Sequence, residues 1–411
     1  MTTVEATIAS VWKAEAAKVI GGLARLVRDV SRAEELAQDA LVIALEQWPK
    51  TGIPQNPGAW LKTTARNRAL NSLRRSKLST QLREVEAPPA TLEAVEALMD
   101  SDVSDDVLRL LFAACHPVLP KEARVALTLR MIGGLTTAEI ARAFLSSEPT
   151  IAQRVVRAKK TLGEANVPFE VPRGEELSPR LSSVLEVVYL IFNEGYSATT
   201  GEDLMRPALM GEALRLASLL SSLAPDEPEV HGLEALLLLQ SSRQSARVDE
   251  NGEPVLLTEQ DRSRWDGTAI DRGLESLARA ESLGKEPGPY RLQAELAACH
   301  ARAATVDDTD WERIAALYAQ LAKLVPSPVI ELNRAVAISR ARGPAAGLAL
   351  LDALRDEPAL ARYHLLPAAR ADLLERLGRN DEARAAFLEA ARLAENSRQR
   401  ERLESRAARV K

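Results

Sequence analysis

The sequence has few of the residues that mark several large classes of protein. It holds only two cysteines in 411 residues, which excludes a disulfide framework and fits a reducing compartment. No apolar run approaches the roughly 18–20 residues that cross a bilayer. Acids and lysines interrupt residues 1–18, where a signal peptide carries its apolar stretch. We therefore expect a cytoplasmic protein that has no membrane contact.

Aromatic residues are also scarce, at 4% of the chain, whereas alanine, leucine and arginine dominate. Strand-rich folds favour aromatic and β-branched residues, while these three residue types favour helices. The sequence contains no glycine-rich phosphate loop, nucleophile elbow or zinc-protease motif. We therefore expect an all-α protein of several domains with no enzyme activity and no cofactor.

The net charge of −5 conceals a strong segregation of charge along the chain. Residues 60–77 hold six basic side chains and no acid, residues 84–106 hold eight acids and no base, and residues 154–160 are basic again. Basic helices on either side of an acidic tether are suited to contact phosphates. The plain alternative for each basic run is a solvated helix face.

Two helices and a loop precede the first basic run. Residues 4–28 and 32–48 have the apolar spacing of helices, and residues 49–59 are rich in proline and glycine, which predicts a loop. The basic helix 60–75 follows. Its inward stripe is predicted to consist of Leu61, Ala65, Ala69 and Leu73.

The second basic run belongs to a predicted helix-turn-helix. Thr136 and Glu139 have the spacing of a capping box that opens one helix. A turn ends at Ser147, and Pro149 fits the first turn of the next helix, where its missing N–H costs nothing. A basic second helix of this kind fits the major groove of DNA. Its predicted buried stripe is Ile151, Val155, Ala158 and Leu162.

The C-terminal half is predicted to be a helical repeat. Residues 165–180 carry three prolines and a glycine, which indicates a domain boundary. Beyond it, Ala301, Ala335 and Ala371 recur 34 and 36 residues apart, and residues 241–270 interrupt the period as an insertion. The last helix pair has tetratricopeptide spacing, so we expect an α-solenoid with a concave face. The residues with that spacing are Gly378, Ala383, Phe387 and Ala390.

These motifs resemble those of an extracytoplasmic-function (ECF) sigma factor of bacterial RNA polymerase. AEELAQDALVIALEQW is similar to the region 2 helix that binds the β′ clamp helices, and WLKTTARNRALNSLRR to the helix that meets −10 DNA. LTTAEIARAFLSSEPTIAQRVVRAKKTL is similar to the region 4 helix-turn-helix that reads the −35 element. VVYLIFNEGYSA, EQDRSRWD, GPYRLQAE and PSPVIELNRAVA resemble the subgroup with a long tetratricopeptide-like extension.

The resemblance implies a domain order and a set of partners. It assigns residues 1–80 to the region 2 helical bundle, 81–105 to an acidic linker, 106–168 to region 4 and 176–411 to a C-terminal regulatory domain. The implied partners are bacterial core RNA polymerase, through its β′ clamp helices and β flap, and promoter DNA. A contact between the C-terminal domain and the sigma regions is a further expectation. Whether that domain inhibits the protein or is required stays open.

The loop 49–59 is the predicted pocket for a base flipped out of the promoter. Gln55 and Asn56 supply amides for base edges, with Trp48 and Trp60 at the rims, unless both tryptophans are core anchors. The predicted −10 contacts are Gln55, Asn56, Trp60, Lys62, Arg66, Asn67, Arg68, Asn71, Arg74 and Arg75. The predicted −35 contacts are Thr150, Gln153, Arg154, Arg157 and Lys160. The predicted polymerase contacts are Glu34, Glu35, Gln38, Asp39 and Leu41.

Two groups in the C-terminal half are candidate regulatory contacts. Asn193, Glu194 and Tyr196 either bind a ligand or dock, or they cap a helix. The insertion is either a contact site or a salt-bridged loop, and its candidates are Asp261, Arg262, Arg264 and Trp265. The basic tail, residues 398–411, is expected to be a solvated capping helix.

Each cysteine precedes a histidine, as Cys115–His116 and Cys299–His300. Adjacent Cys–His pairs are poor geometry for one tetrahedral ion, so we expect no metal and treat the cysteines as small hydrophobic residues. Two other classes of protein stay open. One is a helix-turn-helix regulator with a tetratricopeptide sensor that acts without polymerase, and the other is an interaction scaffold.

Overall fold

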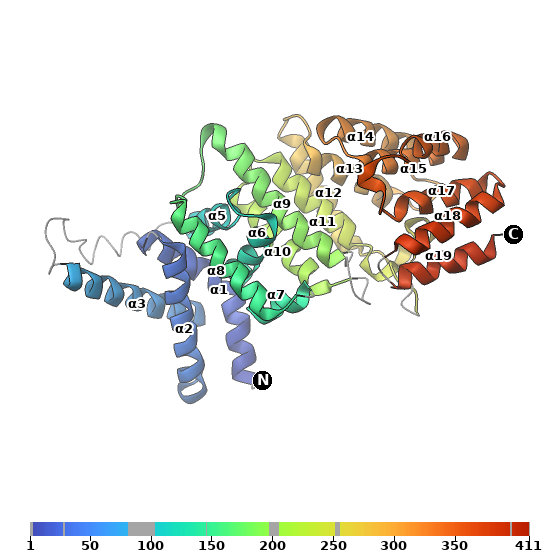
Figure 1. The fold of residues 1–411 in the computed structure, drawn as a ribbon. Coiled ribbons are helices and arrows are strands. Elements are labelled where there is room, and N and C mark those ends of the chain that lie inside the picture. Colours follow the sequence, from blue (N-terminus) through green and yellow to red (C-terminus); the bar gives the residue numbers. More distant parts are fainter. Residues whose placement is uncertain are drawn as a thin grey trace. The chain divides into compact units, whose positions relative to one another are not determined.

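The computed structural model describes most of the chain, and its regular structure is helical, as the composition predicted (Figure 1). None of the described helices has the length and apolar character that crossing a membrane requires. The contacts divide the chain into two compact units, Met1–Ile191 and Phe192–Lys411. The described residues are 3–27, 29–80, 103–144, 146–196, 205–250, 255–394 and 397–410.

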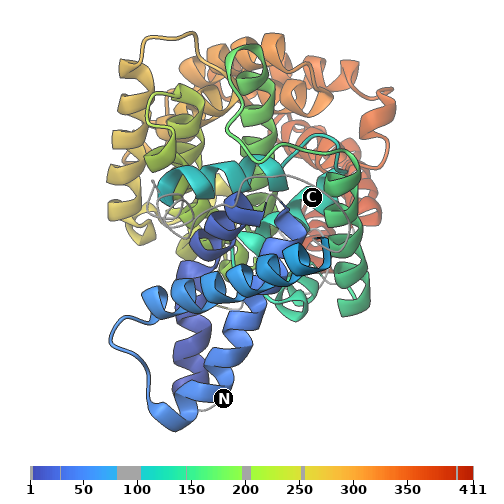
Figure 2. The same ribbon diagram turned by 90° about the vertical axis from the view of Figure 1, so that its left-hand side faces the viewer.

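The first unit begins with three helices, α1 (Thr3–Val27), α2 (Val30–Thr51) and α3 (Pro57–Thr80). Figure 2 shows α3 lying across α1 and α2, and it packs on both. The side chain of Asp29 caps α2 by accepting hydrogen bonds from the backbone N–H groups of Ser31 and Arg32, at 2.8 and 3.1 Å.

The loop predicted at 49–59 is shorter in the structure. The helix α2 continues through Pro49, and Gly52, at φ 84°, ends it by donating its N–H to the Trp48 carbonyl. Proline is tolerated there because only one carbonyl in the last turn loses its donor. The next helix already begins at Pro57, where Asn56 Oδ1 accepts from the Ala59 N–H at 3.0 Å.

The remaining helices of the first unit include the predicted helix-turn-helix. The capping box is confirmed, because Glu139 Oε2 accepts from the Thr136 N–H at 2.8 Å and Thr136 Oγ1 accepts from the Glu139 N–H at 3.1 Å. The side chain of Ser147 caps the second helix, and the predicted stripe is buried. These helices are α5 (Val103–Ala114), α6 (Lys121–Met131), α7 (Thr137–Ala143) and α8 (Glu148–Glu164).

Two glycines bring α1 close to the helix-turn-helix region. A Cβ on Gly21 would lie 2.9 Å from the carbonyl oxygen of Asp106 at the start of α5. A Cβ on Gly134, which has φ +66°, would lie 3.0 Å from Lys13 Cα. The helices on either side of the acidic segment therefore pack directly on each other, and residues 81–102 of that segment lie outside the described residues.

The first unit extends beyond the boundary predicted at 165–180. A 3₁₀ turn (Gly174–Glu176) leads into α9 (Leu177–Tyr196), which runs from the first unit into the second. Ser183 on α9 donates a hydrogen bond to the Cys115 carbonyl and accepts one from Arg124. These buried contacts place the first half of α9 in the core of the first unit.

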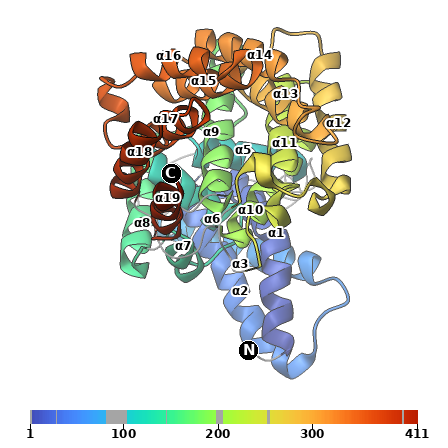
Figure 3. The same ribbon diagram turned by 90° about the vertical axis from the view of Figure 1, so that its right-hand side faces the viewer.

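The second unit is a succession of helices in which chain neighbours pack on each other. Figure 3 shows α12 to α19 following one another round an arc, as expected of a solenoid. Ala335 and Ala371, two of the periodic residues, are completely buried in the first helices of their pairs. The helices are α10 (Pro207–Leu223), α11 (Pro228–Ser241), α12 (Gly267–Ser282), α13 (Pro289–Arg302), α14 (Trp311–Leu324), α15 (Pro328–Arg342), α16 (Pro344–Ala353), α17 (Leu365–Arg376), α18 (Asn380–Leu393) and α19 (Ser397–Arg409).

The sequence explains where many of these helices begin and end. Proline occupies the first helical positions of α10, α11, α13, α15 and α16, where its fixed φ suits the helix. Gly378 turns the chain between α17 and α18 at φ +74°. The predicted insertion connects α11 to α12, and its described residues include the short 3₁₀ turns Gln244–Ala246, Leu257–Glu259 and Arg262–Arg264.

One close crossing in the second unit joins α11 to α13. A Cβ on Gly232 would lie 2.7 Å from the backbone nitrogen of Arg291. One turn earlier, the Glu229 carboxylate accepts from the N–H groups of Tyr290 and Arg291, at 2.8 and 3.2 Å. Burial raises the pKa of Glu229, although these N–H donors oppose the shift. A small residue and a helix cap together set this crossing.

The substitution Gly232→Ala tests the α11–α13 crossing. The added methyl group has no space beside Arg291, so we expect a loss of about 1–3 kcal/mol in the free energy of unfolding. Gly211→Ala on α10 is the matched control, because nothing lies within 4 Å of its Cβ. The control should gain about 0.5–1 kcal/mol from helix propensity. Urea unfolding of the full chain, followed by circular dichroism, measures both; equal effects would contradict the proposed crossing.

Candidate nucleic-acid interface

The helix α8 presents a polar face opposite its buried stripe. Thr150, Gln153, Arg157 and Lys160 are exposed, and Arg154 is half-buried. Thr150 also takes part in the cap, since its N–H donates to Ser147 Oγ at 3.3 Å. Thr137 Oγ1 donates to Glu148 Oε1 at 3.1 Å, which ties α7 to the first turn of α8. All five predicted residues therefore come from one supported helix.

The helix α3 carries a second polar face. Its stripe of Leu61, Ala65 and Ala69 is completely buried. Asn67, Arg68 and Asn71 are exposed, and Lys62 and Arg66 are half-buried. The side chains of Leu73, Arg74 and Arg75 lie outside the described residues. The described part of this face offers two amides and three cations, a combination suited to base edges and phosphates.

The structure modifies the predicted base pocket in the loop 49–59. Trp48 is 1% exposed and packs edge-on against the half-buried Trp60, with ring centroids 5.3 Å apart, so Trp48 is a core anchor. Gln55 is exposed. Asn56 is also exposed, but its carbonyl oxygen already caps α3 and is not available for a base edge.

A cavity of about 450 Å³ does lie beside this loop, between α1 and the start of α3. Asn56 and Lys62, both predicted from sequence, line it together with Glu15 and Lys18 of α1. Glu15 and Lys18 were not predicted from the sequence. Their charges are regularly spaced on an ordinary amphipathic helix, and only the packing of α1 on α3 brings them to the cavity.

Glu34, one of the predicted polymerase contacts, is buried in the structure. Glu34 is 3% exposed. Its Oε1 accepts from Arg130 Nε on α6 at 3.1 Å and from Gln38 Nε2 at 2.5 Å, and its Oε2 accepts from Lys159 Nζ on α8 at 2.5 Å. We call this group, Glu34 with Gln38, Arg130 and Lys159, the Glu34 network. A buried carboxylate needs such partners because it has lost its water.

The rest of the predicted polymerase-binding face is more accessible. Glu35 and Asp39 are exposed, and Gln38 and Leu41 are half-buried. Val42 and Leu45, which the sequence analysis did not select, are 52% and 44% exposed on the same helix. Val42 and Leu45 are three residues apart, so their exposed side chains are neighbours on the surface of α2.

The first group of candidate regulatory residues makes contacts within the second unit. Glu194 forms an ion pair with Arg206. The Tyr196 hydroxyl accepts from Arg243 at 2.9 Å, and the Arg247 guanidinium lies 3.7 Å from the centre of the Tyr196 ring. Asn193 is half-buried. These contacts fit the structural alternative better than a free docking site.

The insertion is held by hydrogen bonds to backbone carbonyls more than by salt bridges. Arg262 donates to the carbonyls of His300 and Ala303, at 2.7 and 2.5 Å, at the C-terminal end of α13. Asp261 caps the last 3₁₀ turn, Arg264 donates to the Ser245 carbonyl, and Trp265 is 8% exposed. These contacts lie within the second unit and fit the structural alternative better than a free contact site.

The two Cys–His pairs have separate surroundings. Cys115 is buried, with Sγ 3.2 Å from Thr128 Oγ1, and burial raises its thiol pKa to about 12. Burial lowers the pKa of His300 to about 4, and the nearby guanidinium groups of Arg243 and Arg262 lower it too. In the described part of the chain, no group of three or more His, Cys, Asp or Glu side chains is arranged to hold a metal.

Family models match three segments of the chain. The Sigma-70 region 2 model matches residues 11–78, and the Sigma-70 region 4 model matches residues 109–162. These segments contain the α3 and α8 faces described above. A family of unknown function, DUF6596, matches residues 180–281. The fold and its two polar helices thus define a protein of the sigma factor class, with a C-terminal extension.

Similar proteins agree with this class. An uncharacterized protein of Rhizobium meliloti is 44% identical over 389 residues, 92% of this chain and 90% of its own length. The ECF RNA polymerase sigma factor SigK of Mycobacterium ulcerans is 31% identical over 150 residues, 35% of this chain and 78% of SigK. The RNA polymerase sigma-H factor of Pseudomonas aeruginosa is 28% identical over 158 residues, 37% of this chain and 82% of that factor. The chain belongs to the ECF sigma factor family.

Glu34→Gln tests whether the Glu34 network keeps the first unit closed. The change leaves two cations without their carboxylate, which typically costs about 3–5 kcal/mol at a buried site. We expect spin labels at Val42 and Val156, which are 52% and 60% exposed on α2 and α8, to show a longer and broader distance distribution. Electron–electron double resonance on a Cys299→Ala background measures it.

Glu35→Gln is the matched control for this experiment. Glu35 is the next residue of the same helix, is exposed, and pairs with Arg32 one turn away. Such surface pairs contribute at most about 1 kcal/mol, so the distance distribution should not change. An unchanged distribution in the Glu34→Gln protein would show that the network does not hold the helices together.

The buried imidazole of His300 predicts acid sensitivity in the second unit. The unfolded side chain binds a proton near pH 6.5, whereas the folded one does so only at about 4. Stability present above pH 6.5 is therefore lost as the pH falls through this window, by about 2 kcal/mol between pH 7 and 5. Urea unfolding at both pH values should show a smaller loss for His300→Gln. An equal loss in the two proteins would contradict the assignment.

Proposed function

We propose that the chain binds core RNA polymerase and directs it to a limited set of promoters. Support comes from the joint presence of two exposed polar helices, α3 and α8, in segments that match sigma regions 2 and 4. A sigma factor needs no covalent catalysis, because it acts by holding DNA and polymerase in one arrangement. No cofactor is needed for that role.

Each helix has a proposed task. The exposed face of α8 reads the −35 element, with Gln153 and Arg157 as the residues best placed for base edges and Arg154 and Lys160 for phosphates. The exposed face of α3 meets the −10 element through Asn67, Arg68 and Asn71. The cavity lined by Asn56 and Lys62, between α1 and α3, receives a flipped base, whose pocket contacts offset the few kcal/mol lost on unstacking.

The helix α2 is the proposed contact with the β′ clamp helices. Glu35, Asp39 and Leu41, joined by Val42 and Leu45, form its accessible face. Glu34 and Gln38 belong to the closed form of the first unit, in which Lys159 of α8 is held against α2. We propose that polymerase binds α2 as α8 is released, so that regions 2 and 4 separate toward the two promoter elements.

The C-terminal unit is proposed to regulate or support this activity. A solenoid of helix pairs offers a long inner face for a partner or a ligand. The candidate residues of this unit make their direct contacts within the unit itself. We therefore propose that a regulatory site lies on the inner face of the solenoid instead. The division into region 2, acidic linker, region 4 and C-terminal domain remains part of this proposal.

The substitution Arg157→Ala tests the proposed −35 contact. Specific transcription with purified core polymerase should fall about fivefold to a hundredfold, because a base-reading arginine is worth about 1–3 kcal/mol. If Arg157 contacts a phosphate instead, binding should weaken uniformly and the slope of log affinity against log salt should decrease by about one. Arg173→Ala is the control, since Arg173 is an exposed arginine beyond the helix-turn-helix.

Association with core polymerase separates the proposed function from its rivals. Retention of the wild-type chain on immobilised core polymerase is expected for a sigma factor. An operator-binding regulator or an interaction scaffold predicts no retention. Failure of both retention and initiation with the wild-type chain would therefore overturn the proposal, whatever the Arg157 variant does.

A further inference from the structure

The second unit contains a cavity that the proposed function does not use. Its volume is about 470 Å³, within the range of small-molecule sites. It is lined mainly by α14, α15, α17 and α19, on the side where the insertion passes. Its wall is largely apolar, through residues that include Ile314, Leu332, Val336, Leu373 and Phe387.

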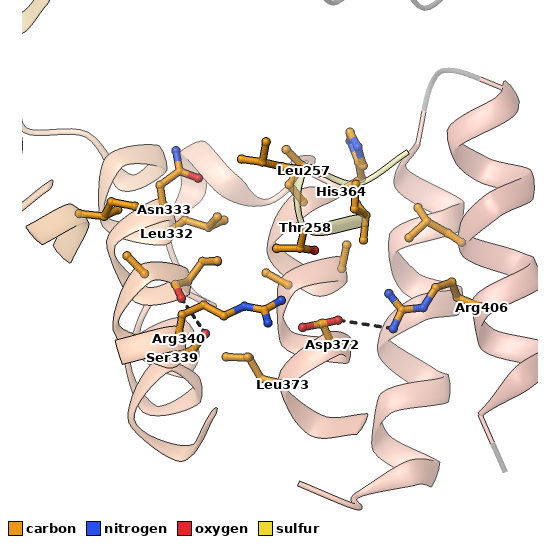
Figure 4. A pocket seen from close by; sticks show the side chains of 18 of the residues that line it. Leu257, Thr258, Leu332, Asn333, Ser339, Arg340, His364, Asp372, Leu373 and Arg406 are labelled. Carbon is orange, nitrogen blue, oxygen red and sulfur yellow. Dashed lines mark hydrogen bonds and ion pairs between the residues drawn. The ribbon is translucent and has the colours of Figure 1, made fainter. Parts of the chain in front are cut away.

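Three guanidinium groups reach this cavity, and two of them are already paired. Arg402 forms an ion pair with Glu259 at 2.7 Å, and Arg406 with Glu375 at 2.5 Å and with Asp372 at 3.4 Å. The third, Arg340, forms no hydrogen bond or ion pair with the described residues, and its guanidinium carbon lies 6.0 Å from the centre of the Trp311 ring. Figure 4 shows its guanidinium group directed into the cavity toward Asp372, whose carboxylate is already bonded to Arg406.

The insertion closes one side of the cavity. Val255, Leu256, Leu257 and Thr258 line it, and Leu256 is 43% exposed. We call residues 255–259 the strap. At its end, the Glu259–Arg402 ion pair attaches it to α19. The strap thus presents aliphatic side chains to the cavity opposite its apolar wall. Arg340 lies within that wall.

An apolar cavity with one cation that has no ion pair favours an apolar ligand with one negative charge. The apolar wall removes the ligand's body from water, which supplies most of the binding free energy. A carboxylate suits a guanidinium group in charge and in shape, because it can accept two parallel hydrogen bonds. A neutral ligand leaves Arg340 without an anion, and a cationic ligand is repelled by it.

We propose that this cavity is a binding site for a small aliphatic carboxylic acid, with Arg340 as the carboxylate anchor and the strap as a wall. The assignment does not depend on the proposed sigma factor activity. The acid lies with its chain between Leu257 and the apolar wall, and its carboxylate replaces solvent on the Arg340 guanidinium group. Glu259 keeps the strap closed over it through Arg402.

Calorimetric titration of the full chain with decanoate, decanol and decylamine tests the site. Decanoate should bind with one-to-one stoichiometry, about tenfold to a hundredfold more tightly than decanol, and decylamine should bind least. Arg340→Gln should abolish this preference for decanoate and leave decanol binding within about twofold. The control, Arg355→Gln, removes an exposed arginine that does not line the cavity and should change nothing.

A second variant tests the strap. Glu259→Gln removes the ion pair with Arg402, so decanoate and decanol should both bind several-fold more weakly while the preference for the acid remains. Equal affinity for the three ligands in the wild-type chain would overturn the proposal. So would an absence of saturable binding, or an Arg340→Gln protein that discriminates as the wild type does.

Discussion

The buried carboxylate of Glu34 is the interaction on which the arrangement of the first unit depends. Loss of water costs such a group several kcal/mol, and Arg130 and Lys159 compensate only while α6 and α8 lie against α2. The network therefore fixes the position of α2 more than it adds stability. Since all three charged groups regain water when they separate, a buried ion pair is a contact that a partner of modest affinity can open.

The second unit depends on nearest-neighbour packing instead. Its buried alanines and glycines let neighbouring helices of the stack approach closely, as Gly232 lets α11 approach α13 and Gly347 lets α16 approach α15. Each helix pair packs only on the neighbouring pairs. A small rotation from one pair to the next curves the stack and creates a concave inner face. The insertion connects α11 to α12, and Arg262 fixes it to the carbonyls at the end of α13, where the helix dipole favours a cation.

Local signals in the sequence were sufficient to predict most of the helices. They were insufficient to predict which helices pack against one another. The capping box at Thr136 and the buried stripe of α8 follow from spacing alone, because both are interactions within one helix and its cap. Glu34 is buried because α6 and α8, which are distant from it in the sequence, pack against α2. The charged residues next to Glu34 along the chain gave no sign of this burial. The tail was likewise expected to be solvated, yet Arg406 and Leu403 of α19 line the cavity of the second unit. Charge density indicates polar contacts and does not distinguish an internal contact from an external one.

The exposed aliphatic residues beside the Glu34 network suggest how opening is coupled to binding. Val42 and Leu45 each expose about half of their side chain, and their burial in a partner surface yields about 2 kcal/mol in total. A partner shifts a conformational equilibrium only by its difference in affinity for the two forms. If polymerase covers these residues only when α8 has moved away, this gain is available solely to the open form. A shift of that size changes the ratio of open to closed molecules about thirtyfold, so under the proposed mechanism the surface of α2 and the network beneath it would act as one switch.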